Sequence, residues 1–370
     1  MKKMIGFSIF LCLLLIAVPL LALGGPPESR PEAKTSSAPP KNPSSAESRE
    51  DLSSSALSSS SSSPPAEAEN LRALTLGQNR KDEVFILYDR ASDQLLTVSA
   101  SEFLYGAVVC EIPLSFADEA LKAQTVACHS YYARKRNIER ANPKDELKGG
   151  DFEVDTEEWH IYTTKEEMEK RWGGRFTEHY NRIKRLVDSV SQTVLLYEGE
   201  PILAAFHAQS GGKTENAFNV WGMEYPYLTA VDSPGDLLAS GYRTETVLPA
   251  EGFRTILESR INGIRLDKSP KNWVGELTIT PSGTVVMCSL GDRKASGAEM
   301  RNFFSLRSAV FDLSYNEKEN EFTFTVLGHG HGVGMSQYGA QEMARQGADY
   351  IEILSWYYPA ANGEILQDLK

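Results

Sequence analysis

Apolar and polar positions divide the chain into three parts. Residues 4–23 are almost all apolar and carry no charge, whereas residues 26–70 contain few large apolar side chains. From about Asp82 onward, apolar and polar positions alternate in short periodic segments. The pattern therefore predicts an apolar N-terminal segment, a polar segment that cannot form a core, and a folded part over residues 81–365.

The N-terminal segment has the length and charge pattern of a membrane span. It follows Lys2 and Lys3, and about 20 apolar residues suffice to cross a bilayer. Because positive residues stay on the cytoplasmic side, we expect residues 1–25 to be a single-pass anchor in the cell membrane, with the C-terminal domain outside the cytoplasm. A signal peptide cleaved near Gly24 is the alternative.

Residues 26–80 have the composition of a linker. They are rich in Ser, Pro, Ala and Glu and include the unbroken serine run Ser58–Ser63. Such a segment buries too little apolar surface to offset the entropy of ordering, so we expect it to be a disordered tether. A glycosylated stalk would have the same composition.

The stretch Tyr105–Arg136 is the strongest local signal. Its apolar residues 106–110 are typical of a short strand, which Glu111 ends. Ser115 is expected to cap a helix that begins at about Phe116, because small and apolar residues then recur three or four positions apart. An acid at such a corner loses solvation, which raises its pKa toward the range of a general acid. An exposed strand end is the alternative.

The remaining pattern mixes helices and strands. Alternating apolar residues predict two hairpins and a late strand, over 82–97, 194–208 and 322–327. Capping signals predict further helices, over 164–172, 182–191, 337–345 and from the Asp349 capping box onward. Short helix and strand signals alternate between 253 and 304. The fold class expected is therefore α+β, one large mixed domain with an inserted or appended sub-domain at about 232–313.

Two Gly-rich polar segments, 209–216 and 328–336, supply most of the candidate binding groups. The candidates are His207, Ser210, Gly211, Lys213, Thr214, Glu215, His331, Ser336, Gln337 and Tyr338. Glycine exposes the backbone, as at a site that a polymer approaches closely, although a buried turn explains the same pattern.

Phosphate and metal chemistry fit these segments poorly. Neither the G-x-G-x-x-G spacing nor the Lys-Ser/Thr of a phosphate-binding loop is present. His329 and His331 would need a third ligand such as His207 to bind a metal, and the spacing does not demand one. We therefore expect neither a metal nor another cofactor.

Net charge and cysteine content limit the expected binding partners and disulfide bonds. The formal net charge of -12 argues against nucleic acid and anionic lipid as partners. Cys12 lies in the apolar segment, and Cys110, Cys128 and Cys288 have no C-x-x-C spacing. A Cys110–Cys128 bridge would require the expected strand to fold straight back on the helix. We expect all three to be small buried residues.

Three segments together resemble the stage II sporulation protein D family. The first block is EIPLSFADEALKAQTVACHSYYA, the second block is FHAQSGGKTENAFNVWG followed by YPYL, and the third block is GHGVGMSQYGAQEMARQGADYIEILSWYYP. The resemblance implies a lytic transglycosylase that cleaves peptidoglycan between N-acetylmuramic acid and N-acetylglucosamine, in glycan strands without stem peptides. It also implies an engulfment complex with a membrane-bound amidase/endopeptidase and a polytopic membrane protein.

The resemblance places the family's catalytic glutamate at Glu111 and its helical lysine at Lys122. Three departures qualify the transfer. His129 stands where the family commonly has Arg, one heptad after Lys122 and so near the same face, and His329 replaces a usually aromatic residue. The region 158–162 lacks the cysteines of zinc-binding members, so no zinc is expected. The same domain occurs in amidase enhancers, which bind wall polymer or a hydrolase without cutting glycan, and this is the alternative function.

Overall fold

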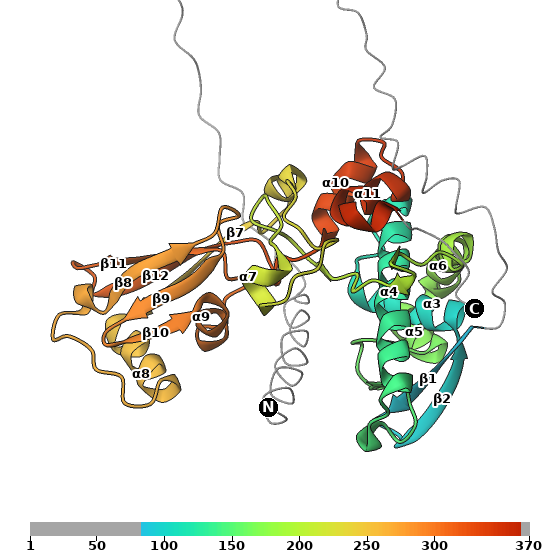
Figure 1. Cartoon of the computed structure of the whole chain (residues 1–370), viewed down its shortest axis with the longest axis horizontal. Helices are drawn as coiled ribbons and strands as arrows, with labels where there is room; N and C mark the ends of the chain where they lie inside the picture. The colour runs from blue at the N-terminus through green and yellow to red at the C-terminus, as the bar shows by residue number, and fades with distance from the viewer. Residues whose placement is uncertain (1–82, 364–370) are drawn as a thin grey trace, which may run out of the picture.

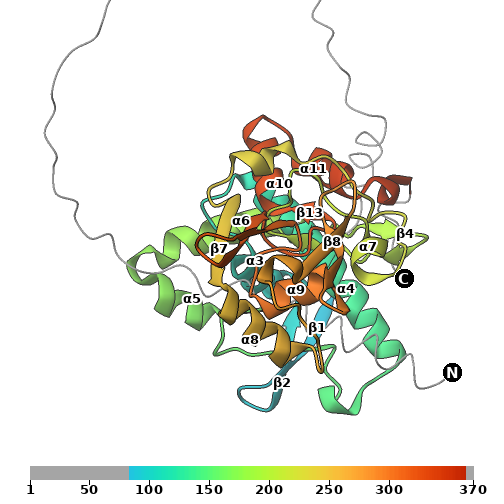
Figure 2. The same ribbon diagram turned by 90° about the vertical axis from the view of Figure 1, so that its left-hand side faces the viewer.

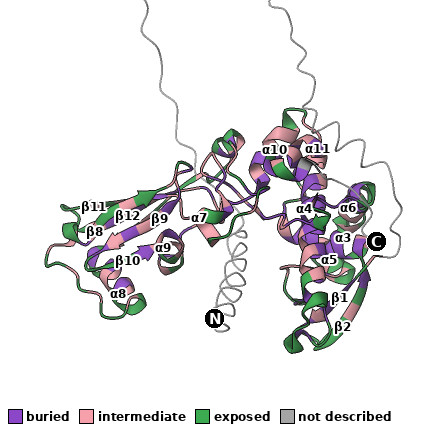
Figure 3. Ribbon diagram, in the orientation of Figure 1, coloured by how far each residue is buried: buried purple, intermediate pink, exposed green. Residues whose placement is uncertain are grey.

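The computed structural model describes residues 83–363, which form the two lobes seen in Figure 1. The first lobe has its core in residues 85–228 and 333–361, and the second in residues 250–326. Figure 3 shows buried residues gathered inside both lobes. This confirms the expected α+β class. The expected anchor over 1–25 and linker over 26–80 lie outside the described residues, and within 83–363 no helix is long and apolar enough to span a membrane.

A small sheet opens the first lobe. Strands β1 (Val84–Asp89) and β2 (Gln94–Ser99) form an antiparallel hairpin, which confirms the prediction. Strand β3 (Phe152–Val154), for which the sequence pattern shows no strand signal, lies parallel to β1. Phe85 and Phe152 fill the interior face of this sheet, with ring centroids 5.8 Å apart.

Helix α3 (Ala100–Glu111) replaces the strand expected over 106–110, so that prediction is wrong. Ser99 caps the helix by accepting from the Glu102 backbone N–H. Residues 103–110 are all buried, because α4 (Asp118–Ala141) and α6 (Phe176–Val190) both pack on α3. A helix that is covered on every side is apolar on every side, and a short apolar run does not distinguish it from a strand.

The long helix α4 begins two residues later than expected and runs five residues further. Its N-cap is Ala117, not Ser115. The Ala117 N–H donates to Gln341 Oε1 over 2.7 Å, and Arg182 holds Asp118 of the first turn over 2.6 Å. Gln341 and Arg182, which are both distant in sequence, therefore set the start of this helix. α4 then runs through the middle of the first lobe (Figure 1).

The first lobe contains several shorter elements. Helix α5 spans Lys165–Trp172, with Thr164 as its cap as expected, and α7 spans Ala217–Trp221. The short strands are β4 (Leu196–Tyr197), β5 (Glu200–Pro201), β6 (Phe206–His207) and β13 (Met335–Ser336). The 3-10 turns are η1 (Asp145–Leu147), η2 (Gly173–Arg175), η3 (Pro234–Leu238), η4 (Pro270–Asn272, in the second lobe) and η5 (Pro359–Gly363).

The hairpin expected over 194–208 is correct only at its turn. β4 and β5 pair there over two residues each. β6, expected in the same second strand, instead pairs in parallel with β13. This pairing joins two segments that are more than a hundred residues apart in the chain.

The second lobe is an insertion between these two segments. Its elements are β7 (Arg243–Pro249), α8 (Ala250–Arg260), β8 (Val274–Ile279), β9 (Val285–Leu290), β10 (Arg293–Ser296), α9 (Gly297–Phe303), β11 (Phe311–Asn316) and β12 (Glu321–Leu327). They form two three-stranded sheets, β10-β9-β8 and β11-β12-β7. Figure 2, viewed from the side of this lobe, shows α8 and α9 toward the viewer. β7 and β12 pair with Arg243 opposite Leu327, so the chain enters and leaves the lobe side by side.

The chain ends its described part in the first lobe. Helix α10 (Gln337–Arg345) has Ser336 as its cap, and α11 (Tyr350–Tyr357) has the capping box of Asp349 and Glu352. Both starts agree with the prediction. α10 and α11 pack on the N-terminal half of α4, which brings the third sequence block onto the first.

Candidate active site around Glu111

Glu111 lies at the last position of α3, directly after the buried residues 103–110. The residue keeps partial exposure, and burial raises the pKa of its carboxyl group from 4.5 to about 7. Within residues 83–363 no hydrogen bond or ion pair to this carboxyl group is found. Glu111 is therefore an acid that can hold a proton near neutral pH and is not tied to another side chain.

Amide side chains connect Glu111 to α10 and α4. Gln337 Nε2 donates to the Glu111 backbone oxygen over 3.0 Å and to Gln124 Oε1 over 3.3 Å. Gln124 in turn donates to Cys128 Sγ over 3.3 Å. Beside Gln337, the Tyr338 ring lies edge-on to the Phe116 ring, with centroids 5.0 Å apart. The structure thus brings the predicted residues Gln337 and Tyr338 to the end of α3.

A buried carboxylate that the sequence did not single out joins the two Gly-rich segments. Asp236, which is fully buried in η3, accepts from the Ser210 backbone N–H over 3.0 Å and from Ser210 Oγ over 2.5 Å. Its other oxygen accepts from Ser336 Oγ over 2.5 Å. Ser210 and Ser336 are therefore internal. Asp236 follows Ser233, Pro234 and Gly235, a composition typical of a turn, so no local pattern marks it as a buried carboxylate.

The glycines of the Gly-rich segment 328–336 serve close backbone packing. A Cβ at Gly330 would lie 2.7 Å from His207 Cβ, and one at Gly334 would lie 2.0 Å from the Ala205 oxygen. At Gly328 a Cβ would lie 2.6 Å from the Ser210 oxygen. All three glycines also have positive φ. The buried-turn interpretation therefore accounts for these positions.

His207 and His331 face one another beside Trp221. Their ring centroids are 5.6 Å apart, and those of His331 and Trp221 are 5.2 Å apart. His207 Nδ1 donates to the Val333 oxygen over 3.1 Å, while its buried Nε2 has no partner within the described chain. Burial lowers the pKa of His207 to about 4 and that of His331 to about 3, so both rings are neutral. In the described part, no three His, Cys, Asp or Glu side chains gather as a metal site would require.

The remaining residues of the second block mostly point inward. Thr214 and Glu215 are buried, and Glu215 accepts from Asn219 Nδ2 over 2.8 Å and from Thr280 Oγ1 of the second lobe over 2.5 Å. Lys213 is 41% exposed and lies 3.5 Å from Asp232. The Gly211 oxygen accepts from the Tyr242 hydroxyl over 3.0 Å. Of these candidates, Lys213 presents a charged group at the surface.

Lys122 and His129 contact groups other than the Glu111 carboxyl. Lys122 Nζ pairs with Glu119 over 2.7 Å and lies 5.9 Å from the Tyr350 ring centre. His129 is 1% exposed, with Nε2 2.9 Å from Glu83 and Nδ1 3.1 Å from the Thr193 oxygen. We expected His129 to contact the substrate. Its burial argues against that contact, because a glycan at the surface does not reach the imidazole ring.

Cys110, Cys128 and Cys288 are buried free thiols, as expected. Burial, followed by the neighbouring Glu111, raises the pKa values of Cys110 and Cys128, and burial raises that of Cys288. All three thiols are therefore protonated and unreactive at neutral pH.

Comparison with known proteins decides the family. A family profile described as Stage II sporulation protein matches residues 88–197, which include Glu111. Stage II sporulation protein D of Bacillus subtilis is 32% identical over 276 residues, which are 74% of this chain and 76% of that protein. The chain belongs to the stage II sporulation protein D family. Its Bacillus amyloliquefaciens member is 30% identical over 273 residues, with 74% of this chain and 76% of that protein covered.

Another relative carries a different name. The Amidase enhancer of Bacillus subtilis is 27% identical over 308 residues, covering 69% of this chain and 39% of that protein. The family to which the chain belongs is named for stage II of sporulation. Because a related protein is named for enhancing an amidase, the family name by itself does not specify the chemistry of this chain.

Proposed function

We propose that the chain is a peptidoglycan lytic transglycosylase that acts on glycan strands without stem peptides during septal wall remodelling and engulfment. The observation that supports this most is the Glu111 carboxyl group, which has a pKa of about 7 and no partner among residues 83–363. A structural acid would be paired or hydrogen-bonded, because burial of an unpaired charge is costly.

One carboxyl group suffices for the reaction. Neutral Glu111 donates its proton to the glycosidic oxygen, and the bond from that oxygen to C1 of N-acetylmuramic acid breaks as the N-acetylglucosamine hydroxyl leaves. Glu111, now a carboxylate, takes the proton of the C6 hydroxyl of the same N-acetylmuramic acid. The C6 oxygen bonds to C1 and closes a 1,6-anhydro ring, and Glu111 is neutral again. Water is not consumed, which distinguishes the reaction from hydrolysis with two carboxylates.

The surroundings of Glu111 suit both steps. Burial keeps the carboxyl group neutral for the first step, and Gln337 holds the backbone of the same residue in place over 3.0 Å. Ser336 caps α10, and its hydroxyl donates to Asp236, which also accepts from Ser210. The start of α10 is thereby tied to the Gly-rich segment 209–216. A rigid supporting shell is what a positioned acid requires.

Digestion of purified glycan strands without stem peptides tests the proposal. Residues 81–370 should release fragments with 1,6-anhydro ends, which mass spectrometry identifies by the absence of one added water. Glu111→Gln and Glu111→Ala should both release none, whereas Glu146→Gln, an exposed acid in η1 of the first lobe, should cleave as the wild type does. Equal cleavage by wild type and Glu111→Gln would contradict the role of Glu111.

A second candidate function is that of an amidase enhancer or wall-binding scaffold. The related Amidase enhancer supports it. In that case the wild type would bind strands without cutting them and would raise the rate of an added cell-wall amidase. Glu111→Gln would then enhance the amidase as well as the wild type does.

We propose further that residues 1–25 anchor the chain in the cell membrane and hold the folded part outside the cytoplasm. The apolar segment after Lys2 and Lys3 supports this. A membrane-bound amidase/endopeptidase that strips stem peptides would supply the substrate, and a polytopic membrane protein would complete the complex. The relative named Amidase enhancer supports a hydrolase as partner.

A further inference from the structure

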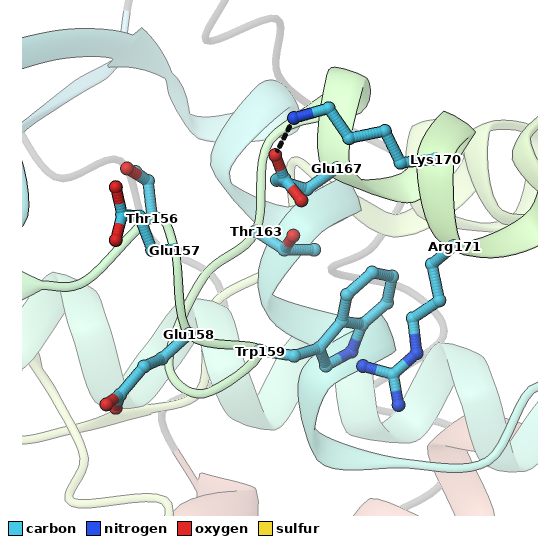
Figure 4. A pocket seen from close by; sticks show the side chains of 8 residues that line it. All are labelled: Thr156, Glu157, Glu158, Trp159, Thr163, Glu167, Lys170 and Arg171. Atoms are coloured by element: carbon cyan, nitrogen blue, oxygen red, sulfur yellow. Dashed lines mark hydrogen bonds and ion pairs between the residues drawn. The ribbon is translucent and has the colours of Figure 1, made fainter.

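A pocket lies in the first lobe beside α3 and α5 (Figure 4). Its volume is about 330 Å³. The lining residues are Thr156, Glu157, Glu158, Trp159, Thr163, Glu167, Lys170 and Arg171. They combine an aromatic ring, carboxylates, hydroxyls and two cations, which is a set of side chains that binds polar ligands with apolar faces.

Arg171 is the cation of this pocket that has no acidic partner. Its guanidinium carbon lies 4.3 Å from the centre of the Trp159 ring, and Figure 4 shows the group stacked beside the indole. Lys170, in contrast, pairs with Glu167. No carboxylate among residues 83–363 lies within salt-bridge distance of Arg171. Its donors are therefore available to a ligand.

Trp159 fixes the position of that guanidinium. Its Nε1 donates to the Val109 oxygen over 3.1 Å, and its ring lies 5.9 Å from the Trp172 ring. Since the indole is held at its edge and its nitrogen, Arg171 rests on a rigid surface. A stacked guanidinium that is already ordered loses less entropy when it binds a planar anion.

The pocket lies at the end of α3 that carries Glu111. Val109, which holds Trp159, is two residues before Glu111, and two residues rise about 3 Å along a helix. Cys110 lies between Val109 and Glu111 in the chain. Burial and then Glu111 raise the pKa of its thiol, whereas Arg171 of the pocket lowers it. The pocket therefore borders the end of α3 that carries Glu111.

The chemistry of Arg171 selects a carboxylate. A guanidinium binds a carboxylate through two parallel hydrogen bonds, and it gains little from a neutral amide. The two exposed acids Glu157 and Glu158 disfavour an anion on their side of the pocket, although their oxygens accept hydrogen bonds from sugar hydroxyls. A ligand that carries one carboxylate and several hydroxyls satisfies both sides.

We propose that this pocket binds the free lactyl carboxylate of N-acetylmuramic acid in a naked glycan strand, with Arg171 as the carboxylate ligand and Trp159 as its support. The proposal rests on the proposed function, because it concerns the same glycan substrate. In a strand with stem peptides, the lactyl carboxylate is an amide without charge. The pocket would therefore distinguish stripped strands from complete ones.

Binding, measured apart from cleavage, tests the proposal. The Glu111→Gln form of residues 81–370 is titrated with naked strands and with strands whose lactyl carboxylates have been converted to methylamides. Naked strands should bind about tenfold more tightly, the effect of one charge-assisted hydrogen-bond pair. Adding Arg171→Gln should weaken binding of naked strands about tenfold and leave that of amidated strands unchanged. Arg175→Gln, another exposed arginine that does not line the pocket, is the matched control.

Two results would overturn the inference. One is equal affinity for naked and amidated strands, and the other is an Arg171→Gln variant that binds naked strands like the control. Thermal unfolding of each variant shows whether the fold is intact, and Arg171 is exposed enough for its loss to be tolerated. Arg171-dependent binding by a chain that never cleaves strands would refute the proposed transglycosylase but keep this subsite.

Discussion

At the scale of single residues, the environment of a carboxyl group decides what it can do. Glu83 and Glu111 are both close to the first lobe's core, yet burial raises the pKa of Glu111 to about 7. Burial alone would also raise the pKa of Glu83, but His129 and Arg136 outweigh it and hold that pKa at about 2. Glu83 is thus a permanent anion and Glu111 an exchangeable acid.

The activity should follow the protonation of Glu111. Because the first step needs the neutral acid, kcat/KM on naked strands should be level below pH 7 and fall about tenfold per pH unit above it. Initial rates from pH 5 to 9 provide the measurement. A profile that rises through pH 7 would mean that Glu111 is not the proton donor.

The protonation of Glu111 should also affect the free energy of unfolding. Its pKa is raised above 4.5 in the folded chain, so the folded state binds more protons between pH 4.5 and 7. The stability that neutral Glu111 contributes is therefore complete below pH 4.5 and is lost as the pH rises through 7. Glu111→Gln should unfold at higher urea than wild type at about pH 8, with the difference shrinking at acid pH.

At the scale of elements, local sequence signals predicted where some helices begin better than they predicted whether a buried segment is a helix or a strand. The caps Thr164, Ser336 and Asp349 were predictable, since each bonds a backbone N–H within its own first turn. The strand expected over 106–110 became part of α3, because burial on all sides removes the polar face that shows a helix period. The start of α4 depends on Gln341, which lies in α10, and no local pattern encodes such a contact.

The candidate site shows the same limit. Glu111 could be singled out from the residues that flank it, and Gln337 and Tyr338 came with the third block. Asp236 could not, because its role depends on two serines that meet only through the parallel pairing of β6 and β13. Long-range pairing between short strands leaves almost no trace in local hydrophobic periodicity.

One ion-pair cluster joins the first strand to the central helix. Glu83, beside β1, lies 2.9 Å from His129 of α4 and pairs with Arg136 two turns further on. Glu83→Ala should lower the unfolding free energy at neutral pH by about 3 kcal/mol, since two buried donors lose their acceptor. Urea denaturation measures this.

The control for Glu83 is Glu146→Ala in η1, an exposed position, which should change stability by less than about 0.5 kcal/mol. Because the Glu83 pKa is lowered from 4.5 to about 2, its stabilisation is present above pH 4.5 and is lost as the pH falls toward 2. The difference between wild type and Glu83→Ala should shrink over that interval. Equal denaturation midpoints at pH 7 would contradict the argument.

At the scale of the whole molecule, the second lobe contacts the Gly-rich segment 209–216 of the first lobe. Thr280 of the second lobe reaches Glu215 over 2.5 Å, and Ser282 donates to the Thr214 oxygen over 2.8 Å. Arg307 donates to the Gly241 oxygen over 2.7 Å. The second lobe therefore buttresses the second block, although its aromatic core around Phe253 is its own.

The proposed anchor predicts where the molecule is found. After lysis, the full chain should sediment with membranes, resist a high-salt wash and be released by detergent, whereas residues 81–370 should stay in the supernatant. Immunoblotting of each fraction provides the measurement. A full-length product recovered in the supernatant, with a new N-terminus near Gly24, would show a cleaved signal peptide instead.

The side-by-side entry and exit of the second lobe has a consequence for how such proteins diversify. Arg243 faces Leu327 across β7 and β12, and the Gly328 N–H donates to the Tyr242 oxygen over 2.8 Å. Because the chain enters and leaves the second lobe through two adjacent strands, evolution can enlarge or shrink the parts of that lobe that lie away from Thr280 and Ser282 without altering the path of α3, α4 or α10. The loops of that lobe farthest from the first lobe would likewise accept a reporter protein whose own termini lie close together, which would make the chain visible in a living cell.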